Sequence, residues 1–232
     1  LGVELLDTLE LPGGMRDALR SRITGDPLPD ILPAHLDDLS PDDIAAIFED
    51  HTGLPIAALE QRLLPDQASE TGFLAPGERL GEVIAADARR LRELGVSRHA
   101  LADLLELGLL WHERPSERLA ALPETSDDFG GFRASAARAA ELARNAGLEG
   151  EDDAPFEVQP VISPKGFQED PFVWARHRAS RDFVIRSRRH PHLRITGSAL
   201  AVPLIRRACF FEGRVRYRVD PELAARVLGL LA

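Results

Sequence analysis

Apolar residues recur at helical spacing through the first two thirds of the chain, and prolines and glycines separate the segments. Ser40-Pro41-Asp42-Asp43 predicts a helix start, because the hydroxyl accepts an early backbone N–H and the carboxylates suit the positive end of the helix dipole. Further helices are predicted over residues 55–64, over a segment opened by Pro76 and stopped by Gly95, and over residues 97–107 and 132–145. We therefore expect residues 1–147 to form a helical domain.

The pattern changes to strict alternation in the last third of the chain. Phe183 and Ile185 point to one side of a predicted strand, and Arg186 and Arg188 point to the other. Two further half-buried strands are predicted over residues 193–196 and 214–219, of which the second alternates most cleanly. Between these strands the sequence predicts a short helix or turn over residues 203–208 and a hairpin bend at Glu212-Gly213.

A helix is predicted at the C-terminal end, because Asp220-Pro221-Glu222 is typical of a helix start and an apolar face follows it. The segment 148–160 is rich in carboxylates and prolines and has little helical patterning. These features predict an α+β fold: an acidic helical domain (1–147), an acidic linker (148–160), and a small antiparallel sheet domain with a C-terminal helix (161–232).

The composition indicates a globular protein rather than a disordered or membrane-spanning one. The chain has 232 residues, a mass of 25.5 kDa and 44% hydrophobic residues, and no apolar run reaches the roughly 18 residues of a membrane span. Cys209 is the single cysteine, which excludes an internal disulfide. No signal-peptide pattern opens the chain, so a cytoplasmic location is expected, although the start at Leu1 is compatible with a trimmed leader.

The net charge of −10 is the sum over two parts of the chain with opposite net charge. Residues 161–232 contain 14 basic and 6 acidic side chains, a net charge of +8, which leaves −18 for the rest of the chain. Such asymmetry is typical of proteins that bind a polyanion or carry a tail with its own partner.

The arginines of the predicted strands form the candidate binding site. If Val215, Tyr217 and Val219 face the core, the arginines between them line the opposite face, and those of the neighbouring strands join them. Like charges on one sheet face require a bound anion or paired carboxylates. Seven of the 13 aromatic residues also lie in residues 161–232, and arginines with aromatic rings on a sheet are typical of single-stranded nucleic acid binders. The predicted site residues are Arg186, Arg188, Arg194, Arg214, Arg216, Arg218, Trp174 and Tyr217.

Two function hypotheses follow from this face. In the first, the protein is a non-enzymatic binding or regulatory protein whose arginine face engages an anionic partner, with single-stranded nucleic acid as the specific version. In the second, it is a protein interaction module, such as an inhibitor, immunity protein or assembly factor, in which the basic face pairs with the acidic helical half or with another subunit. A homo-oligomer is compatible with both.

The segment around Gly95 resembles the turn and second helix of a helix-turn-helix. Leu94-Gly95-Val96-Ser97 supplies the turn, and Leu101 and Leu104 would lock the two helices. The face that would enter the DNA groove contains Arg98, His99 and Asp103, a poor set for a phosphate-rich surface. An ordinary helical hairpin is the preferred interpretation.

Catalytic and metal chemistry have weaker support. His177, His190, His192 and Cys209 share one predicted domain, but no spaced cysteine pair or His-Glu-x-x-His pattern accompanies them, so loop histidines and a core cysteine are expected. Glu169-Asp170 forms either an acid/base pair in an aromatic cleft or, preferably, salt bridges with nearby arginines. The sequence shows no nucleotide-binding glycine motif. No catalytic residue, metal ligand or cofactor is therefore assigned.

Overall fold

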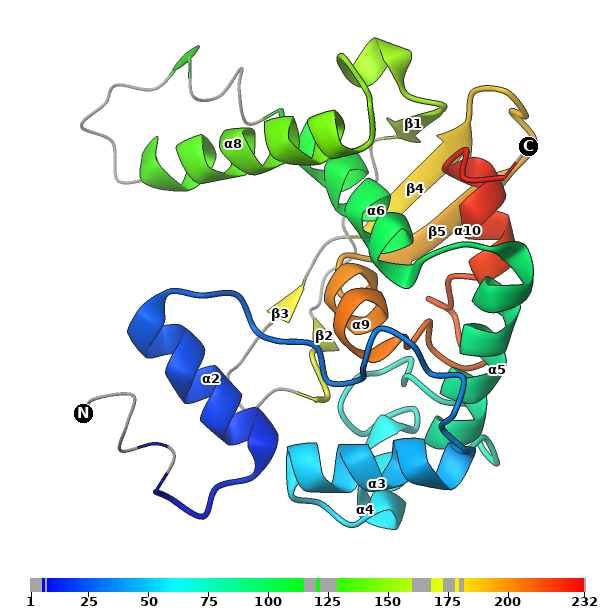
Figure 1. Cartoon of the computed structure of the whole chain (residues 1–232). Helices are drawn as coiled ribbons and strands as arrows, with labels where there is room; N and C mark the ends of the chain where they lie inside the picture. Colours follow the sequence, from blue (N-terminus) through cyan, green and yellow to red (C-terminus); the bar gives the residue numbers. More distant parts are fainter. Residues whose placement is uncertain are drawn as a thin grey trace.

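The computed structural model describes residues 6, 8–114, 120–121, 129–159, 168–172, 178–179 and 182–231. Over these residues the chain is an α+β protein, as predicted, with many helices and a small antiparallel sheet (Figure 1). The helices are α2 (Gly13–Thr24), α3 (Pro41–Thr52), α4 (Ile56–Leu63), α5 (Leu80–Leu94), α6 (Arg98–Glu113), α8 (Phe129–Asn145), the short 3-10 helix η1 (Glu151–Asp153), α9 (Ala201–Ala208) and α10 (Pro221–Val227). The strands are β1 (Phe156–Gln159), β2 (Gln168–Glu169), β3 (Arg178–Ala179), β4 (Asp182–Ser187) and β5 (Arg194–Ser198).

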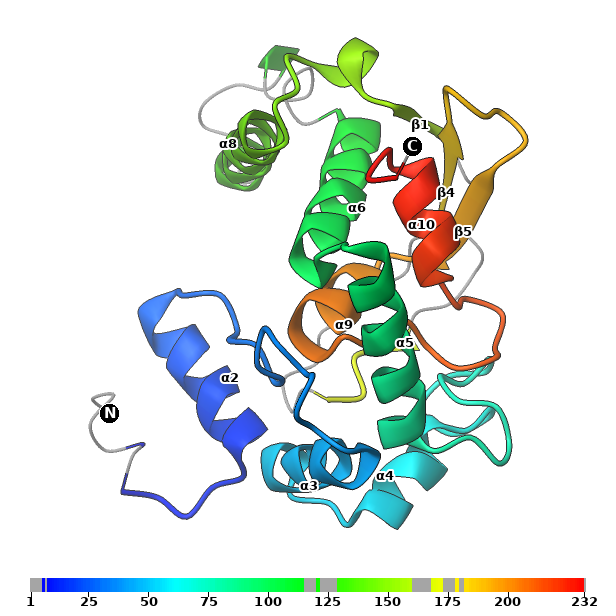
Figure 2. The same ribbon diagram turned by 45° about the vertical axis from the view of Figure 1, so that its right-hand side comes forward.

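The main sheet has the strand order β1-β4-β5, with both pairs antiparallel, and β2 and β3 form a separate pair. One face of the sheet is buried, because Phe156, Ile185 and Ile195 lie on it with almost no exposed surface. Helix α6 packs against β1, and α10 packs against β4 and β5. Figure 2 shows α10 between this sheet and helix α5. The opposite face carries the polar residues of the strands, as the alternation in β4 predicts.

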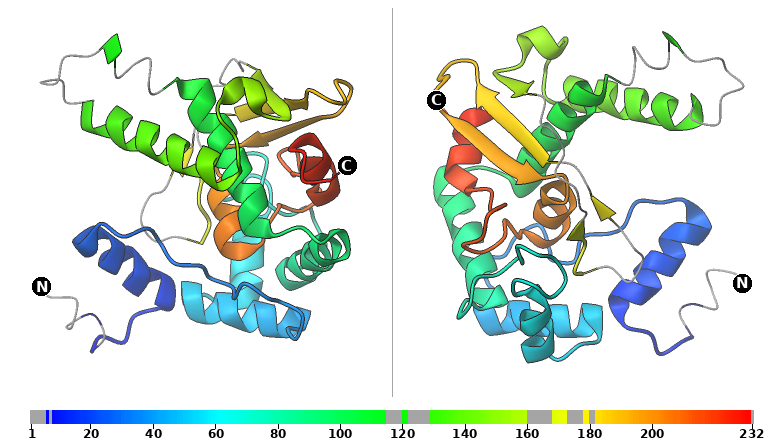
Figure 3. Two further views of the ribbon diagram at one scale, coloured as in Figure 1. Left: turned by 45° about the horizontal axis from the view of Figure 1, so that its top comes forward. Right: turned by 180° about the vertical axis from the view of Figure 1, so that it is seen from behind.

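One hydrophobic cluster joins the helices to the sheet segment. Phe172 links the two parts: its ring centroid lies 4.7 Å from that of Phe48 in α3 and 5.6 Å from that of Phe210, which follows α9. Helix α9 also packs on α6. Helices α2 and α8 lie at the periphery (Figure 3), and α8 contributes Ala139, Leu142 and Ala143 to this cluster. The division into two domains at residues 148–160 stays a prediction.

Local capping explains the helices that the sequence predicts well. The Ser40 hydroxyl accepts from the Asp43 N–H, and the Asp43 carboxylate accepts from the Ser40 N–H, which forms a capping box. Gly95 ends α5 at φ 66°, a left-handed conformation that glycine adopts without strain. The Asp220 carboxylate caps α10 by accepting from the Leu223 N–H. Helix α5 begins at Leu80 rather than at Pro76, and α2 is a helix that the sequence analysis did not predict.

The prediction of a strand over residues 214–219 is wrong. Tyr217 and Val219 are buried, so burial follows the alternation, but no strand pairs with this segment. Its backbone is engaged elsewhere: the Gly213 N–H donates to the Phe73 carbonyl and the Val219 N–H donates to the Phe211 carbonyl. The segment is a loop between α9 and α10, and the hairpin bend predicted at residues 212–213 is therefore also absent. The alternative of a short helix for residues 203–208 is confirmed by α9.

The segment predicted as a linker, 148–160, contains regular structure. Helix η1 is followed by β1, which pairs with β4 over the register Phe156↔Ser187 to Gln159↔Val184. Burial of Phe156 against the ring of Trp111, at 6.1 Å between centroids, holds the strand on the sheet. The high density of carboxylates belongs to the turn before the strand. Among the described residues, no helix is both long and apolar enough to span a membrane.

Candidate interface for an anionic partner

The structure divides the six predicted arginines between two settings. Arg186, Arg188 and Arg194 belong to the β4–β5 hairpin. Arg214, Arg216 and Arg218 belong to the loop of residues 211–219, which we name the clamp loop because it ties α5 to the sheet. The single six-arginine face predicted from the sequence is therefore not formed.

On the outer face of the hairpin, Arg186 lies directly opposite Arg194 in the antiparallel register, and Glu157 lies opposite Arg186 on its other side. Arg186 donates only a long hydrogen bond, 3.5 Å from Nη2 to the Gln159 Oε1, and its buried Nε has no partner. Arg194 is exposed. The cross-strand row of Glu157, Arg186 and Arg194 carries two positive charges and one negative charge, so it keeps a net positive charge that an added anion would balance.

The turn of the hairpin extends the positive charge. Arg188 donates from Nε to the Phe156 carbonyl at 3.1 Å and from Nη1 to the Asp152 carbonyl at 2.9 Å. Arg189 and the two histidines that follow are exposed, and the rings of His190 and His192 meet edge to face at 6.1 Å. Within the described part of the chain, no carboxylate forms an ion pair with any of these six side chains. We name the set the basic hairpin: Arg186, Arg188, Arg189, His190, His192 and Arg194.

Arg214 is held by a carboxylate from the helical part of the chain. Its Nε lies 3.0 Å from the Glu78 Oε1, and its backbone N–H donates to the same carboxylate at 2.9 Å. Burial opposes ionisation of Glu78, but hydrogen bonds from the Ala75 N–H and from Arg214 outweigh it and hold the pKa of this carboxyl below its usual value. This end of the clamp loop is therefore neutralised within the molecule.

Arg218 forms the second internal ion pair of the clamp loop. Its Nη2 lies 2.6 Å from the Asp87 Oδ1 and its Nη1 lies 3.1 Å from the Asp87 Oδ2, a bidentate contact to the middle of α5. Nη1 also donates to the Glu212 carbonyl. Asp87 is buried, and its desolvation outweighs the attraction of Arg218, so the pKa of this carboxyl lies above its usual value.

Of the two aromatic residues predicted to stack on nucleic acid bases, the structure describes Tyr217, which is not exposed for stacking. Tyr217 is 7% exposed, and its hydroxyl donates to the Asp182 Oδ2 at 3.1 Å. The Arg216 guanidinium lies 5.3 Å from the centroid of the Tyr217 ring, over its face. Trp174 lies outside the described residues. At Tyr217, the predicted pairing of arginine and aromatic ring is therefore a contact with Arg216 inside the molecule.

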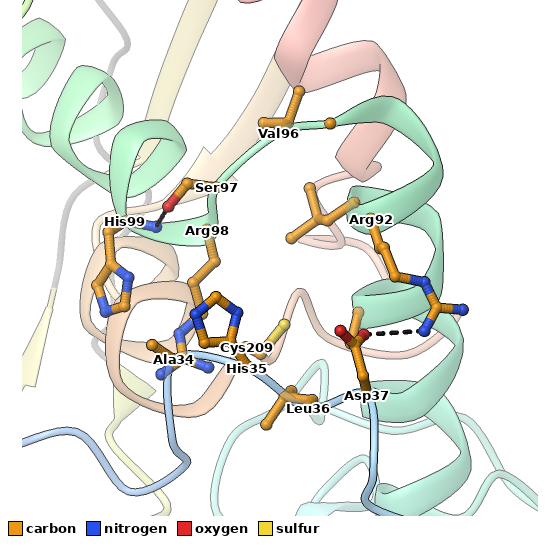
Figure 4. Close-up of a pocket in the computed structure, with 13 residues that line it drawn as sticks. Ala34, His35, Leu36, Asp37, Arg92, Val96, Ser97, Arg98, His99 and Cys209 are labelled. Carbon is orange, nitrogen blue, oxygen red and sulfur yellow. Dashed lines mark hydrogen bonds and ion pairs between the residues drawn. The ribbon is translucent and has the colours of Figure 1, made fainter.

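The segment that resembles a helix-turn-helix is a helical hairpin with a buried arginine. Arg98, at the start of α6, is 4% exposed and donates to the carbonyls of Pro33 and Leu32 at 2.8 and 2.6 Å. It is therefore not available to a DNA groove. His99 lies 2.7 Å from the Asp30 carboxylate. A cavity of about 350 Å³ lies beside this turn, with Cys209 on its wall (Figure 4).

Cys209 and Asp170, both considered for chemistry, are buried within the fold. Burial raises the pKa of the Cys209 thiol to about 12, which keeps it protonated and unreactive at neutral pH. Asp170 is buried, accepts from the Phe172 N–H at 2.9 Å and lies 3.8 Å from Arg207, which supports the salt-bridge interpretation. His177 lies outside the described residues. Among the described residues, no group of three or more potential ligands could hold a metal ion.

Sequence reasoning missed two features. Arg189 was left out of the predicted site, although residues 183–211 contain no acidic side chain and so mark the whole hairpin as basic. Glu212 was also missed. It is 1% exposed at φ 66°, neither carboxylate oxygen has a hydrogen-bond partner among the described residues, and burial raises its pKa to about 8. Its apolar neighbours Phe210 and Phe211 were the available signal.

Comparison with known proteins gives no relative for this chain: no family model, no curated protein and no solved structure matches it.

Proposed function

We propose that the protein is a binding protein that engages an anionic partner through the basic hairpin. The observation that carries this proposal is the absence of ion pairs within the described residues at four arginines spaced over nine positions, from Arg186 to Arg194. Elsewhere the structure pairs comparable arginines, such as Arg218 with Asp87. Arg188, Arg189 and Arg194 are exposed, and exposed guanidiniums without an ion pair gain most from a partner's negative charge.

An acidic protein surface is the partner class that the described residues favour. Sequence-tolerant binding of single strands depends on aromatic rings on which bases stack. Tyr217, the described aromatic residue proposed for that role, is buried and bonded to Asp182. Guanidiniums alone can bind carboxylates in bidentate pairs without any stacking. Single-stranded nucleic acid remains the alternative that the experiment separates.

The test measures binding of a fluorescent polyglutamate peptide and of a fluorescent single-stranded oligonucleotide at low and at physiological salt. The hairpin variant is Arg189→Glu/Arg194→Glu. Both side chains are exposed, and a glutamate at position 194 would face Arg186 across the strands, which favours folding. The matched control is Arg62→Glu/Arg89→Glu, which makes the same charge change at exposed sites in α4 and α5.

We expect the wild-type protein and the control variant to bind polyglutamate with an affinity that falls as salt rises. The affinity of the hairpin variant for polyglutamate should be lower by roughly 10-fold or more, because the substituted side chains repel the peptide instead of attracting it. Equal binding by the hairpin and control variants would overturn the proposal. Hairpin-dependent binding of the oligonucleotide alone would replace the protein partner with a nucleic acid.

A further inference from the structure

A cluster of exposed carboxylates lies directly beside the basic hairpin. Two hydrogen bonds to main-chain carbonyls join them: the Arg188 backbone N–H donates to the Pro155 carbonyl at 2.9 Å, and the Arg188 side-chain Nη1 donates to the Asp152 carbonyl at 2.9 Å. In Figure 1, the turn with η1 and the connection between β4 and β5 lie at the same edge of the molecule. We name this cluster the acidic turn: Glu149, Glu151, Asp152 and Asp153.

The carboxylates of the acidic turn do not neutralise the hairpin within one molecule. No carboxylate of the turn forms an ion pair in the described part of the chain, and Asp153 accepts only a long hydrogen bond from the Glu149 N–H, at 3.4 Å. Arg188 donates a hydrogen bond to the backbone carbonyl of Asp152 and not to its carboxylate. Two patches of opposite sign therefore lie next to each other, each with its charge unpaired.

A cavity of about 580 Å³ with both polar and apolar lining residues lies between the two patches. Arg189 of the hairpin and Asp153 of the turn both line it. Its apolar walls come from α6, α8 and the residues after α10, including Leu104, Leu142 and Leu230. A second aspartate on the wall, Asp103, is already bound by Arg206 at 2.7 Å. The end of the hairpin at Arg189, the cavity and the acidic turn thus form one surface with a positive zone, a mixed zone and a negative zone.

We propose that this surface binds the same surface of a second copy of the chain, related by a two-fold axis. The basic hairpin of each copy then lies on the acidic turn of the other. This inference rests on the proposed function, because it identifies the acidic protein surface as the turn of an identical molecule.

The arrangement of the three zones favours a second copy of the chain as the partner. In a two-fold interface each patch meets its counterpart twice, so a surface with adjacent zones of opposite sign is complementary to itself. The exposed charges of the two patches are Arg188, Arg189 and Arg194 on the hairpin and four carboxylates on the turn. The half-buried Leu230 lies between them and would lose its remaining contact with water.

The decisive experiment uses two charge-reversed variants and their mixture. One is the hairpin variant, Arg189→Glu/Arg194→Glu, and the other is a turn variant, Glu151→Lys/Asp152→Lys. Sedimentation velocity should show a concentration-dependent dimer for the wild-type protein, which weakens at high salt. Each variant alone should be monomeric, because like charges then face each other in both halves of the interface.

A mixture of the two variants should restore a heterodimer, since the negative hairpin of one then meets the positive turn of the other, twice. The control variant Arg62→Glu/Arg89→Glu should dimerise as the wild-type protein does. Circular dichroism checks that all variants are folded. A wild-type protein that stays monomeric, or variants that fail to complement each other, would overturn the inference.

Failure of this inference is distinguishable from failure of the proposed function. If the protein is monomeric but still binds polyglutamate through the hairpin, the proposed function stands and a second copy is not the partner. A protein that neither dimerises nor binds polyglutamate removes both.

Discussion

The basic hairpin and the clamp loop both contain arginines at alternating positions, but only arginines of the clamp loop form ion pairs within the described part of the molecule. Arg186 and Arg194 lie on two paired strands and face each other; Glu157 lies opposite Arg186 on β1, but neither arginine forms an ion pair among the described residues. Arg214 and Arg218 lie on an unpaired loop and bind Glu78 and Asp87. The comparison teaches that alternation sets which side chains are buried, whereas the carboxylates within reach decide whether an arginine holds the fold together or is left for a partner.

The clamp loop should therefore control stability and the hairpin should control binding. The loop connects segments that are remote in sequence: the Gly213 N–H bonds to the Phe73 carbonyl, and the Tyr217 hydroxyl bonds to Asp182. The hairpin makes no comparable side-chain contact to the helical part of the chain in the described residues. Four substitutions test this division.

Arg218→Ala should have the largest effect, a loss of about 3–5 kcal/mol in the free energy of unfolding. The substitution leaves Asp87 as an uncompensated carboxylate, because only 6% of the Asp87 side chain is exposed. Urea denaturation measures the change. The double variant Asp87→Leu/Arg218→Leu is the control and should regain most of the stability, since it removes both charges. A loss below about 1 kcal/mol for Arg218→Ala would show that the pair does not hold the loop.

Glu212 should make stability fall as pH rises. In the unfolded chain this carboxyl loses its proton near 4.5, while burial raises its pKa in the folded protein to about 8. The folded state therefore keeps a proton that the unfolded state has lost, and stability declines between these pH values. Each pH unit in that window corresponds to about 1.4 kcal/mol at most.

Comparison with Glu212→Gln isolates this contribution from the other carboxylates. We expect the difference in unfolding free energy, variant minus wild type, to grow in favour of the variant by a few kcal/mol between pH 5 and pH 8, roughly the window set by the two pKa values. Urea denaturation at each pH measures it. A difference that stays constant over this range would show that Glu212 is not buried as a neutral group.

The elements that the sequence predicted correctly depend on neighbours along the chain. The capping box at Ser40 and Asp43 spans three residues, and the stop of α5 needs only Gly95. The alternation in β4 was also read correctly, because Phe183 and Ile185 are buried on one face. Such signals are local, and the pattern of a short segment contains them.

The elements that were predicted wrongly depend on residues far away in sequence. Arg218 meets Asp87 across 131 positions and Arg214 meets Glu78 across 136, and these contacts hold the clamp loop where a strand was expected. The edge strand β1 was assigned to a linker, because carboxylates of the preceding turn masked the short apolar pattern around Phe156. No local pattern reports which distant partner a side chain will find.

Arg214→Ala should lower stability by only about 0.2–1 kcal/mol. The Arg214 side chain is 79% exposed, so water screens its attraction to Glu78, and Glu78 keeps the backbone N–H donors of Ala75 and Arg214. Denaturation at low and high salt measures the difference, which should shrink as salt rises. An effect as large as that of Arg218→Ala would mean that the two ion pairs of the clamp loop act as one unit.

Arg194→Glu should have the smallest effect on stability, within about 0.5 kcal/mol of the wild-type protein. It replaces one of two facing guanidiniums in the β4–β5 register with an opposite charge, so the pair with Arg186 becomes attractive and any change should favour the folded state. Urea denaturation should therefore detect little, while the affinity for polyglutamate falls. A side chain whose charge governs binding but hardly affects folding is what separates the hairpin from the clamp loop. If Arg194→Glu destabilised the fold as strongly as Arg218→Ala does, the hairpin and the clamp loop would both stabilise the fold, and the proposed difference between them would be wrong.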